Sequence, residues 1–248
     1  MKSLGTARFF KIRYWIVLLV FCFFPLAARA QDNAVTAKVV EVKQGTDTVS
    51  NAPNVVVWLI ALDNSAQESA NHVAVDRSPQ LVQQNKTFEP HVLVVKVGTV
   101  VQFPNRDPFF HNIFSLYDGK RFDLGLYEAG TTRSVRFDRP GVSFLFCNIH
   151  AEMSASVVAV DTPYFAISDR LGRVSITNVP DGRYEMHIWD ERGTPESLKS
   201  LTRTVVISQS SRALSPIRVM DNPDFTLAHK NKYGQDYVPP PNSGYVQP

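Results

Sequence analysis

The feature that most constrains this chain is the segment 144–155, which reads Phe-Leu-Phe-Cys-Asn-Ile-His-Ala-Glu-Met-Ser-Ala. It places Cys147, His150 and Met153 three residues apart, so one short loop offers a thiol, an imidazole and a thioether. Another histidine, His111, lies 36 residues before the cysteine, in Phe-His-Asn-Ile-Phe. A chain organised around these residues needs a scaffold that holds the loop rigidly and brings His111 to it.

Two imidazoles, one thiolate and a weakly bound thioether form the ligand set of blue-copper electron-transfer sites. Sulfur ligands suit Cu(I) and imidazoles suit Cu(II), so this set can hold the ion in both oxidation states. The sequence therefore predicts one copper ion bound by His111, Cys147, His150 and Met153. We expect Asn112, beside the first histidine, to join the two ligand-bearing segments by hydrogen bonds.

The N-terminus predicts export. Residues 1–30 carry a basic start, an apolar run at 14–24 and the small-x-small sequence Ala28-Arg29-Ala30, which is the pattern of a secretory signal. We predict cleavage near Ala30 and a periplasmic or secreted protein without stable membrane insertion. The chain has two cysteines, and Cys22 lies within this signal. In an oxidising compartment the remaining thiol is either buried as a small apolar group or bound, and its His and Met neighbours favour binding.

The charge balance argues against nucleic acid as a partner. The chain has a formal net charge of +3, but five of its 26 Lys and Arg residues lie in 1–30, which holds none of its 23 Asp and Glu residues. Removing the signal therefore leaves 21 basic residues and a net charge near −2. This balance gives no reason to expect a basic surface for nucleic acid or an anionic membrane.

Hydrophobic alternation predicts an all-β fold. Short runs rich in Val, Ile, Phe and Thr alternate with turn residues, and no stretch of a dozen residues shows a helical apolar stripe. We expect His111 at a strand end or loop rim, a long loop at 62–89, and a hairpin at 91–103. The other expected strands up to residue 161 are 35–42, 55–61, 134–138, 142–147 and 154–160, and the last two should hold the ligand loop between them.

The pattern changes at residue 162. Strands are expected within 165–189, at 201–208 and at 213–219, which is enough for a small second β-unit. Beyond residue 220, Pro, Asn, Gly, Tyr and Gln dominate and no core can form. We therefore predict a signal peptide at 1–30, a copper domain at 31–161, a small β-sandwich at 162–220 and a disordered tail at 221–248.

The ligand-bearing motifs resemble the cupredoxin family, which includes plastocyanin, pseudoazurin and amicyanin. They read Phe-Pro-Asn-x-Asp, His-Asn-Ile-Phe, Pro-Gly and Phe-Cys-x-x-His-x-x-Met. The resemblance covers roughly 90–161, with 35–61 expected to supply earlier strands, and it implies a Greek-key β-sandwich. The short His-x-x-Met spacing is similar to that of amicyanin. Ile149 stands where proline is often found in the family.

The resemblance also implies roles for the ligands. His111, Cys147 and His150 match the equatorial ligands, and Met153 matches the axial one. His150, on the exposed loop, would pass electrons to a transient partner such as a c-type cytochrome or a periplasmic oxidoreductase.

Residues 162–219 resemble, more loosely, the carboxypeptidase-regulatory-like (prealbumin-like) β-domains. The resemblance rests on Asp-x-x-Gly-x-Val at 169–174 and Val-Pro-x-Gly-x-Tyr at 179–184. It implies an accessory or interaction module. His187 and Trp189 share one face of a predicted strand, which favours packing or a partner surface over metal binding.

These observations favour an exported mononuclear blue-copper protein that acts in electron transfer and is not an enzyme. The same ligands would also serve a periplasmic copper storage, delivery or sensing protein with no redox partner. A structural or adhesion module with an inactive site is a third class. The chain has no His-x-His pair for further copper centres and no general acid–base cluster, so we expect neither oxidase nor nitrite reductase activity.

Overall fold

The computed structural model describes residues 33–46, 48–63, 78–116 and 119–237. Regular structure in these ranges is almost entirely β-strand, with one short helix, α2 (Pro195–Ser200), so the predicted all-β class is confirmed. No helix among them is long and apolar enough to cross a bilayer. The predicted signal at 1–30 lies outside the described residues.

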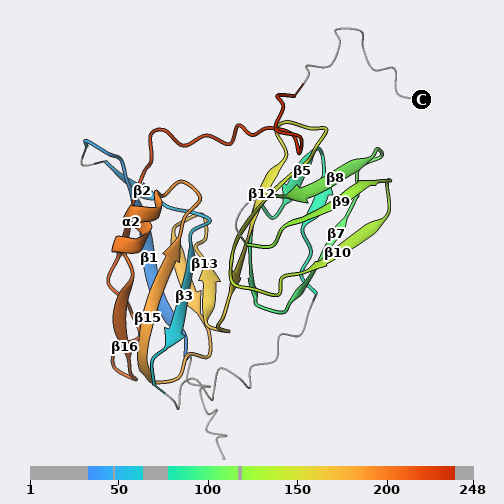
Figure 1. Cartoon of the computed structure of the whole chain (residues 1–248). Helices are drawn as coiled ribbons and strands as arrows, with labels where there is room; N and C mark the ends of the chain where they lie inside the picture. Colours follow the sequence, from blue (N-terminus) through green and yellow to red (C-terminus); the bar gives the residue numbers. More distant parts are fainter. Residues whose placement is uncertain (1–32, 47, 64–77, 117–118, 238–248) are drawn as a thin grey trace, which may run out of the picture. The chain divides into compact units, whose positions relative to one another are not determined.

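Two sheets of the middle part of the chain enclose one buried core, and we call this unit the ligand sandwich (Figure 1). The five-stranded sheet has the order β6-β12-β11-β8-β9, and a two-stranded sheet pairs β10 with β7. Phe103 of β7 shares the core with Ile113 of β8 and Leu145 of β11. The bounds are β6 (Val92–Lys96), β7 (Val100–Pro104), β8 (His111–Ser115), β9 (Phe122–Tyr127), β10 (Thr132–Arg136), β11 (Gly141–Phe146) and β12 (Ser154–Val160).

The ligand loop closes a hairpin, as predicted. β11 and β12 pair antiparallel in a register that ends with Phe146 opposite Ser154, so residues 147–153 form the connection. On its other side β11 pairs with β8, where Phe146 lies opposite Phe114. Because these strands run antiparallel, the N-terminal end of β8 lies beside the loop that follows β11. This pairing brings His111 to the loop.

Two sequence expectations in this region are wrong. Residues 91–103 are not a hairpin, because β6 pairs in parallel with β12 while β7 pairs with β10, so the turn at Gly98 leads from one sheet to the other. The expected loop 62–89 contains a hairpin of β4 (Val82–Gln84) and β5 (Thr87–Glu89). Its two-residue turn has φ of 54° at Asn85 and 55° at Lys86. Lys86 occupies the position where such turns favour glycine. Because the glycine is absent, the sequence does not predict this turn.

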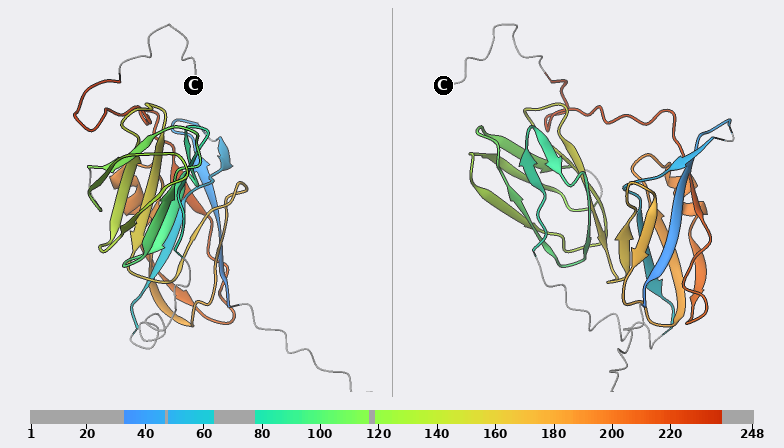
Figure 2. Two further views of the ribbon diagram at one scale, coloured as in Figure 1. Left: turned by 90° about the vertical axis from the view of Figure 1, so that its right-hand side faces the viewer. Right: turned by 180° about the vertical axis from the view of Figure 1, so that it is seen from behind.

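A second pair of sheets follows the orders β13-β3-β15-β16 and β14-β1-β17, with β2 beside β1, and we call it the second sandwich. In the view from behind in Figure 2, the blue strand β1 runs alongside the yellow and orange strands of the C-terminal half. The bounds are β1 (Val35–Val42), β2 (Val49–Asn51), β3 (Val56–Ala61), β13 (Phe165–Ile167), β14 (Arg173–Ile176), β15 (Gly182–Trp189), β16 (Arg203–Ile207) and β17 (Ile217–Met220).

The expectation that residues 35–61 add strands to the copper-ligand unit is therefore wrong. β3 pairs with β15 over six residues, from Ala61 opposite Tyr184 to Val56 opposite Trp189. β1 pairs with β14 and β17. An apolar run such as that of β3 fits the core of either sandwich, and only long-range pairing decides between them. The domain limits at 161/162 and 220/221 stay predictions.

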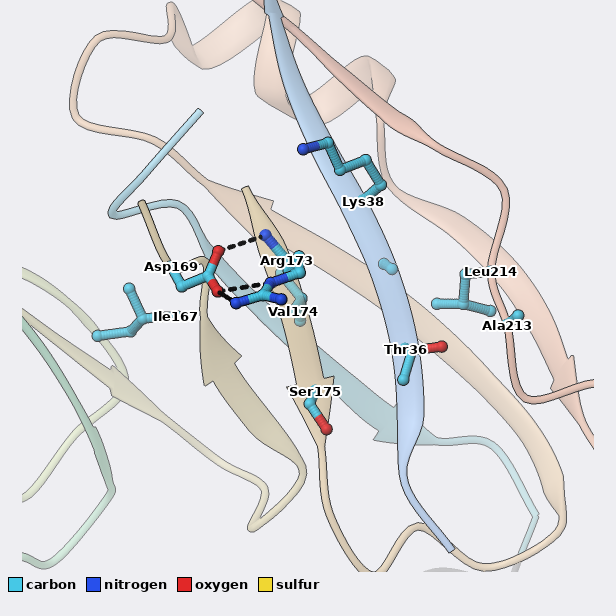
Figure 3. Close-up of a pocket in the computed structure, with 10 residues that line it drawn as sticks. Thr36, Lys38, Ile167, Asp169, Arg173, Val174, Ser175, Ala213 and Leu214 are labelled. Atoms are coloured by element: carbon cyan, nitrogen blue, oxygen red, sulfur yellow. Dashed lines mark hydrogen bonds and ion pairs between the residues drawn. The ribbon is translucent and has the colours of Figure 1, made fainter. Parts of the chain in front are cut away.

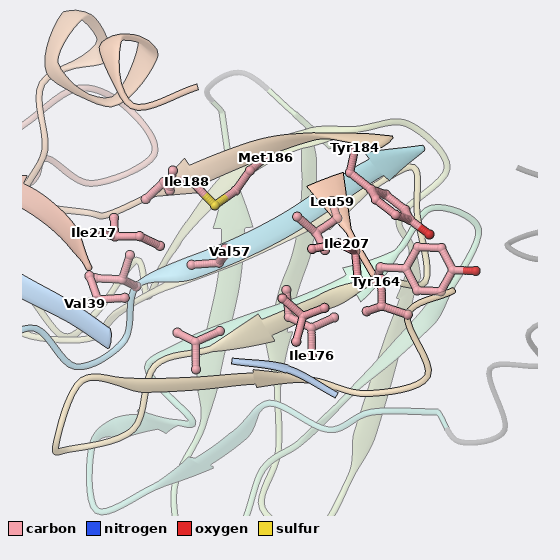
Figure 4. Packing of buried hydrophobic residues seen from close by; sticks show 14 of the residues in the cluster. Val39, Val57, Leu59, Tyr164, Ile176, Tyr184, Met186, Ile188, Ile207 and Ile217 are labelled. Carbon is pink, nitrogen blue, oxygen red and sulfur yellow. The ribbon is translucent and has the colours of Figure 1, made fainter. Parts of the chain in front are cut away.

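The core of the second sandwich is almost entirely aliphatic and aromatic (Figure 4). Leu59, Ile176 and Tyr184 point into it from different strands, and all three are buried. The turn between β13 and β14 requires glycine at Gly172, where φ is +70° and a Cβ would overlap the carbonyl oxygen of Val39.

The predicted disordered tail is only partly tested. Residues 238–248 lie outside the described residues. Residues 222–237 contain no strand, yet they form defined side-chain and backbone hydrogen bonds. Polar contacts rather than a core hold this part in place.

Candidate metal centre

His111, Cys147 and His150 meet at the loop end of the ligand sandwich. One ligand atom from each lies within 4.8 Å of the other two. The Cys147 Sγ is 3.8 Å from Nδ1 of His111 and 3.6 Å from Nδ1 of His150. The thiol and the first imidazole are fully buried, whereas His150 is half-buried. Three of the four ligands that the sequence predicts could therefore hold one metal ion.

Met153 lies at the far end of the same loop. Its backbone N–H donates to the carbonyl of His150, and its carbonyl accepts from the Cys147 N–H, both at 3.2 Å. These two bonds fold the loop into a tight turn. The Met153 side chain is fully buried in the core cluster that includes Cys147. Its role as a ligand stays a prediction.

A buried carboxylate holds the outer side of the His111 ring. Asp107 Oδ2 accepts a hydrogen bond from His111 Nε2 at 2.7 Å, which directs Nδ1 toward the sulfur. The carboxylate also accepts from the backbone N–H of Asn85 at 2.6 Å and of Lys86 at 3.0 Å. Burial alone would raise the pKa of Asp107, but these donors outweigh it and its pKa lies below the ordinary carboxyl value. Asp107 is therefore anionic at neutral pH.

The loop around Asp107 is built by Asn105, which is also buried. Its side chain donates to the Phe109 carbonyl at 2.8 Å and accepts from the Asp107 N–H at 3.0 Å. These bonds fix the approach to His111 before the strand β8 begins.

The electrostatics of the sulfur favour a bound cation. Burial raises the pKa of the Cys147 thiol, although the nearby backbone N–H groups of Asn112, Ile149 and His150 act in the opposite direction. Burial, together with His111 and Lys86, lowers the pKa of His150, so this imidazole is neutral at pH 7 and its lone pair is free for a metal. A metal ion would supply the positive charge that a buried thiolate lacks.

Asn112 supports the site differently from the prediction. Its side-chain Nδ2 donates to Asp123 Oδ1 at 2.7 Å, and no bond from this side chain to the ligand loop is present among the described residues. The backbone N–H of Asn112 instead acts on Cys147 electrostatically, by lowering the pKa of its thiol.

Phe109 covers the two imidazoles on one side. Its ring centroid lies 5.2 Å from that of His111 and 5.6 Å from that of His150. The ammonium group of Lys86 lies over the same ring, 5.5 Å from its centroid. Nearby in the sequence, Phe110 and Ile149 are exposed. The centre therefore combines a shielded interior with two exposed apolar side chains, each next to a ligand histidine in the sequence.

Sequence reasoning missed Asp107 and the β4–β5 turn that supports it. The motif Phe-Pro-Asn-x-Asp enters the sequence prediction only through the family resemblance. An acidic residue four positions before a ligand histidine, on a turn that leads into its strand, is a signal that could have identified the carboxylate.

A pocket lies elsewhere, on the second sandwich (Figure 3). Its charged groups have partners: Arg173 forms an ion pair with Asp169 at 2.8 Å, and Lys38 donates to the side-chain Oδ1 of Asn51 at 2.7 Å. No histidine or cysteine is among its described lining residues. This pocket offers no alternative metal centre. Also in this sandwich, His187 stacks on Trp58, with ring centroids 5.2 Å apart, which agrees with the predicted packing role.

Comparisons with known proteins find likeness in structure alone. No family model and no curated protein sequence matches the chain. A purple cupredoxin from Nitrosopumilus maritimus resembles it with 24% identity and a TM-score of 0.30, over 33% of this chain and 99% of that one. An amicyanin mutant has 24% identity and a TM-score of 0.32, over 37% of this chain and 89% of that one.

A copper-containing nitrite reductase from Thermus scotoductus SA-01 has 24% identity and a TM-score of 0.32. The likeness covers 36% of this chain and only 25% of the reductase. Similarity at these TM-scores does not assign the chain to a family. The interpretation that follows rests on the geometry of His111, Cys147 and His150.

Proposed function

We propose that this chain is an exported copper protein that carries electrons. One copper ion would be held by His111, Cys147 and His150, with Met153 as a weaker fourth ligand. When bound, the copper ion would supply one-electron redox chemistry by alternating between Cu(I) and Cu(II).

The donor set fits copper better than zinc. Structural zinc sites are usually closed by four ligands drawn from Cys, His and carboxylates. Among the described residues, the group of converging His, Cys, Asp and Glu side chains has three members. The nearby carboxylate, Asp107, already bonds to the far side of the His111 ring. A buried thioether in the same loop, at Met153, is a donor that selects Cu(I).

The difference in exposure between the ligands carries the proposal. Cys147 and His111 are fully buried, whereas the His150 side chain is half-buried. Solvent and competing ligands are kept from the sulfur, yet the edge of one imidazole reaches the surface. This arrangement suits electron exchange through His150. It suits metal delivery less, because a receiving protein would need access to more than one ligand.

The protein's own residues keep the donors in place. The β11–β12 hairpin fixes the loop, Asp107 holds the proton on Nε2 of His111, and Phe109 excludes water from both rings. Donors that are fixed in advance need little rearrangement when the charge at the centre changes. A rigid centre of this kind favours fast electron exchange.

The exposed Phe110 and Ile149 provide an apolar surface for a redox partner beside His150. A c-type cytochrome or another periplasmic oxidoreductase would fit this role. Electron-transfer complexes are short-lived and bury less than about 1,200 Å², so we expect weak and transient binding.

Copper addition to the purified protein tests the metal centre. We expect one equivalent of Cu(II) to produce an intense visible thiolate charge-transfer band, and Cys147→Ser to lose it completely. Ser143→Ala, a buried change on β11 away from the loop, serves as the matched control and should keep the band. A colourless protein that prefers Zn²⁺ would overturn the proposal.

Reduction by a partner separates electron transfer from copper storage or sensing. A carrier should be reduced rapidly and reversibly by a reduced c-type cytochrome, and Ile149→Lys should slow this step while leaving the visible band intact. A storage protein with the same ligands would bind copper but exchange electrons slowly with every cytochrome tried. N-terminal sequencing of the exported protein would test the predicted cleavage near Ala30.

A further inference from the structure

The segment 222–237, which we call the C-terminal strap, contacts the ligand loop directly. The Tyr237 hydroxyl donates to the backbone carbonyl of Cys147 at 2.6 Å. The backbone N–H of Lys232 donates to Asn148 Oδ1 at 3.0 Å. The strap therefore bonds to a metal-ligand residue and to its immediate neighbour, although Tyr237 lies 90 residues beyond Cys147 in the sequence.

A second anchor ties the strap to β9. Lys232 Nζ forms an ion pair with Asp123 Oδ2 at 2.7 Å, and its side chain is 23% exposed. The other oxygen of Asp123 accepts from the side chain of Asn112. Asn112 is the immediate neighbour of His111 on β8. The strap is thus joined to the metal centre by two routes, one through the Cys147 carbonyl and one through Asp123 to Asn112.

Ring stacking adds an apolar contact. The His229 imidazole stacks on Phe146, with centroids 4.2 Å apart and an interplanar angle of 26°. Tyr237 packs edge-on against the same imidazole at 5.3 Å. Phe146 is the last residue of β11, so this contact lies at the point where the chain enters the ligand loop.

We propose that the C-terminal strap keeps the ligand loop closed over the Cys147 sulfur. In this role Tyr237 is a positioning residue for Cys147. The strap holds residues 146–148 from outside the sandwich, and the loop must break these contacts before the sulfur can reach solvent. Its loss would expose the thiol of the metal-free protein and speed the escape of a bound metal. The statement about a bound metal rests on the proposed copper function, whereas the statement about the thiol does not.

The opening of such a loop is a local equilibrium, and the reaction of a buried group with a solvent reagent follows it. Hydrogen bonds that exist only in the closed state lower the open population. Removing one ordinary hydrogen bond should therefore raise the open population by about fivefold. Removing the whole strap should raise it by about 25-fold or more, since two hydrogen bonds, an ion pair and the stacking contact are lost together.

Alkylation of Cys147 in the metal-free chain tests the proposal. With Cys22→Ser as the background, only one thiol remains, and its reaction with N-ethylmaleimide is followed by mass spectrometry. Tyr237→Phe should speed alkylation by about fivefold. A chain that ends after Asn222 should react faster still, whereas a chain that ends after Tyr237 should react at the original rate.

Two lysines of the strap provide a matched pair. Lys232→Met removes the ion pair to Asp123 and should speed alkylation, whereas Lys230→Met removes a weak, exposed pair to Asp236 at 3.9 Å and should not. The far-ultraviolet circular dichroism and the unfolding midpoint of each variant show whether the strands remain folded. Equal alkylation rates for Tyr237→Phe, the chain ending after Asn222 and the original chain would overturn the proposal.

A second measurement separates this proposal from the copper function. In copper-loaded protein, Tyr237→Phe should speed the removal of Cu(I) by bathocuproine disulfonate in parallel with alkylation. If the chain binds no copper but its alkylation rates differ as stated, the copper function fails and the strap proposal stands. If copper binds tightly and neither rate changes, the copper function stands and the strap proposal fails.

Discussion

The two sandwiches of this chain bury different kinds of side chain. The core of the second sandwich is aliphatic and aromatic, and its buried polar residues, such as Thr162, Ser168 and Asp190, lie in the connections between strands. The ligand sandwich has an equally apolar middle, but its loop end, strand β8 and the β4–β5 hairpin bury a series of polar side chains. This series contains Gln83, Asn105, Asp107, His111, Asn112 and Ser115.

The difference shows what each unit is built to do. Burying polar groups destabilises a fold unless hydrogen bonds compensate. At the loop end most of these groups are compensated, since Asn105 and Asp107 bond to several partners each. Others are not: Gln83 Oε1, Asn112 Oδ1 and Ser115 Oγ have no partner among the described residues. Such incomplete satisfaction is expected where a site, rather than stability, determines the residues.

The largest expected effect tests the packing role of the second sandwich. Leu59 is fully buried there, and Leu59→Ala should lower the free energy of unfolding by about 2–5 kcal/mol through lost burial and a residual cavity. Urea denaturation measures it, and the visible spectrum of the copper-loaded protein should stay unchanged. Val206→Ala, at an exposed position of β16, is the control and should alter stability by less than about 0.5 kcal/mol. A shifted copper band in Leu59→Ala would contradict the claim that the second sandwich contributes stability and not the metal centre.

The next effect concerns the polar end of the ligand sandwich. Asp107→Asn keeps the shape of the side chain, but an amide has one acceptor oxygen where the carboxylate accepts from three donors. The support of His111 is lost, so copper affinity should fall by about 10–100-fold, as for other groups that orient a ligand histidine. Competition with a copper chelator measures this. The exposed carboxylate Asp138, changed to Asn, should leave the affinity as it was.

A buried acid in the second sandwich should make stability depend on pH. Burial raises the pKa of Asp190 to about 6 in the folded protein. Because the folded pKa exceeds the unfolded value of about 4, stability is greatest below pH 4 for this group and declines as pH rises through 6. At pH 8, Asp190→Asn should therefore be more stable than the original protein by roughly 2–3 kcal/mol.

Urea denaturation at pH 4 and at pH 8 checks this linkage. The advantage of Asp190→Asn should disappear at pH 4, where the acid is protonated in both states. An advantage of the same size at both pH values would show that packing, not charge burial, separates the two proteins.

The smallest effect tests the turn that supports Asp107. Lys86 adopts a left-handed backbone conformation that glycine accepts more readily, although glycine also gains freedom in the unfolded chain. Lys86→Gly should raise the free energy of unfolding by about 0.5 kcal/mol. The backbone N–H to Asp107 is retained, so copper affinity should stay within about twofold of the original. A tenfold loss of affinity would show that the lysine ammonium, rather than the amide, supports the site.

Much of the metal centre could be predicted from the sequence because it is local. The spacing of Cys147, His150 and Met153, and the apolar runs on either side, indicate a loop held by a hairpin, and the structure contains that hairpin. The motif around His111 identifies this residue as the second histidine ligand. Its placement depends on the pairing of β8 with β11, which no local pattern records.

What could not be predicted is long-range or hidden by an unusual residue. The alternation in β1 and the apolar run in β3 identify strands but not the sandwich to which they belong. The β4–β5 turn lacks the expected glycine, so the support of Asp107 was not visible. The strap is held by a few polar bonds, and a composition that forbids a core does not forbid those bonds.

X-ray absorption at the copper edge of the loaded protein tests the central claim most directly. The account predicts a copper environment that contains one short bond to the thiolate sulfur and two imidazoles, and a spectrum from Cys147→Ser protein that lacks this short sulfur contribution. A copper environment made only of nitrogen and oxygen, with no change in the Cys147→Ser protein, would contradict it.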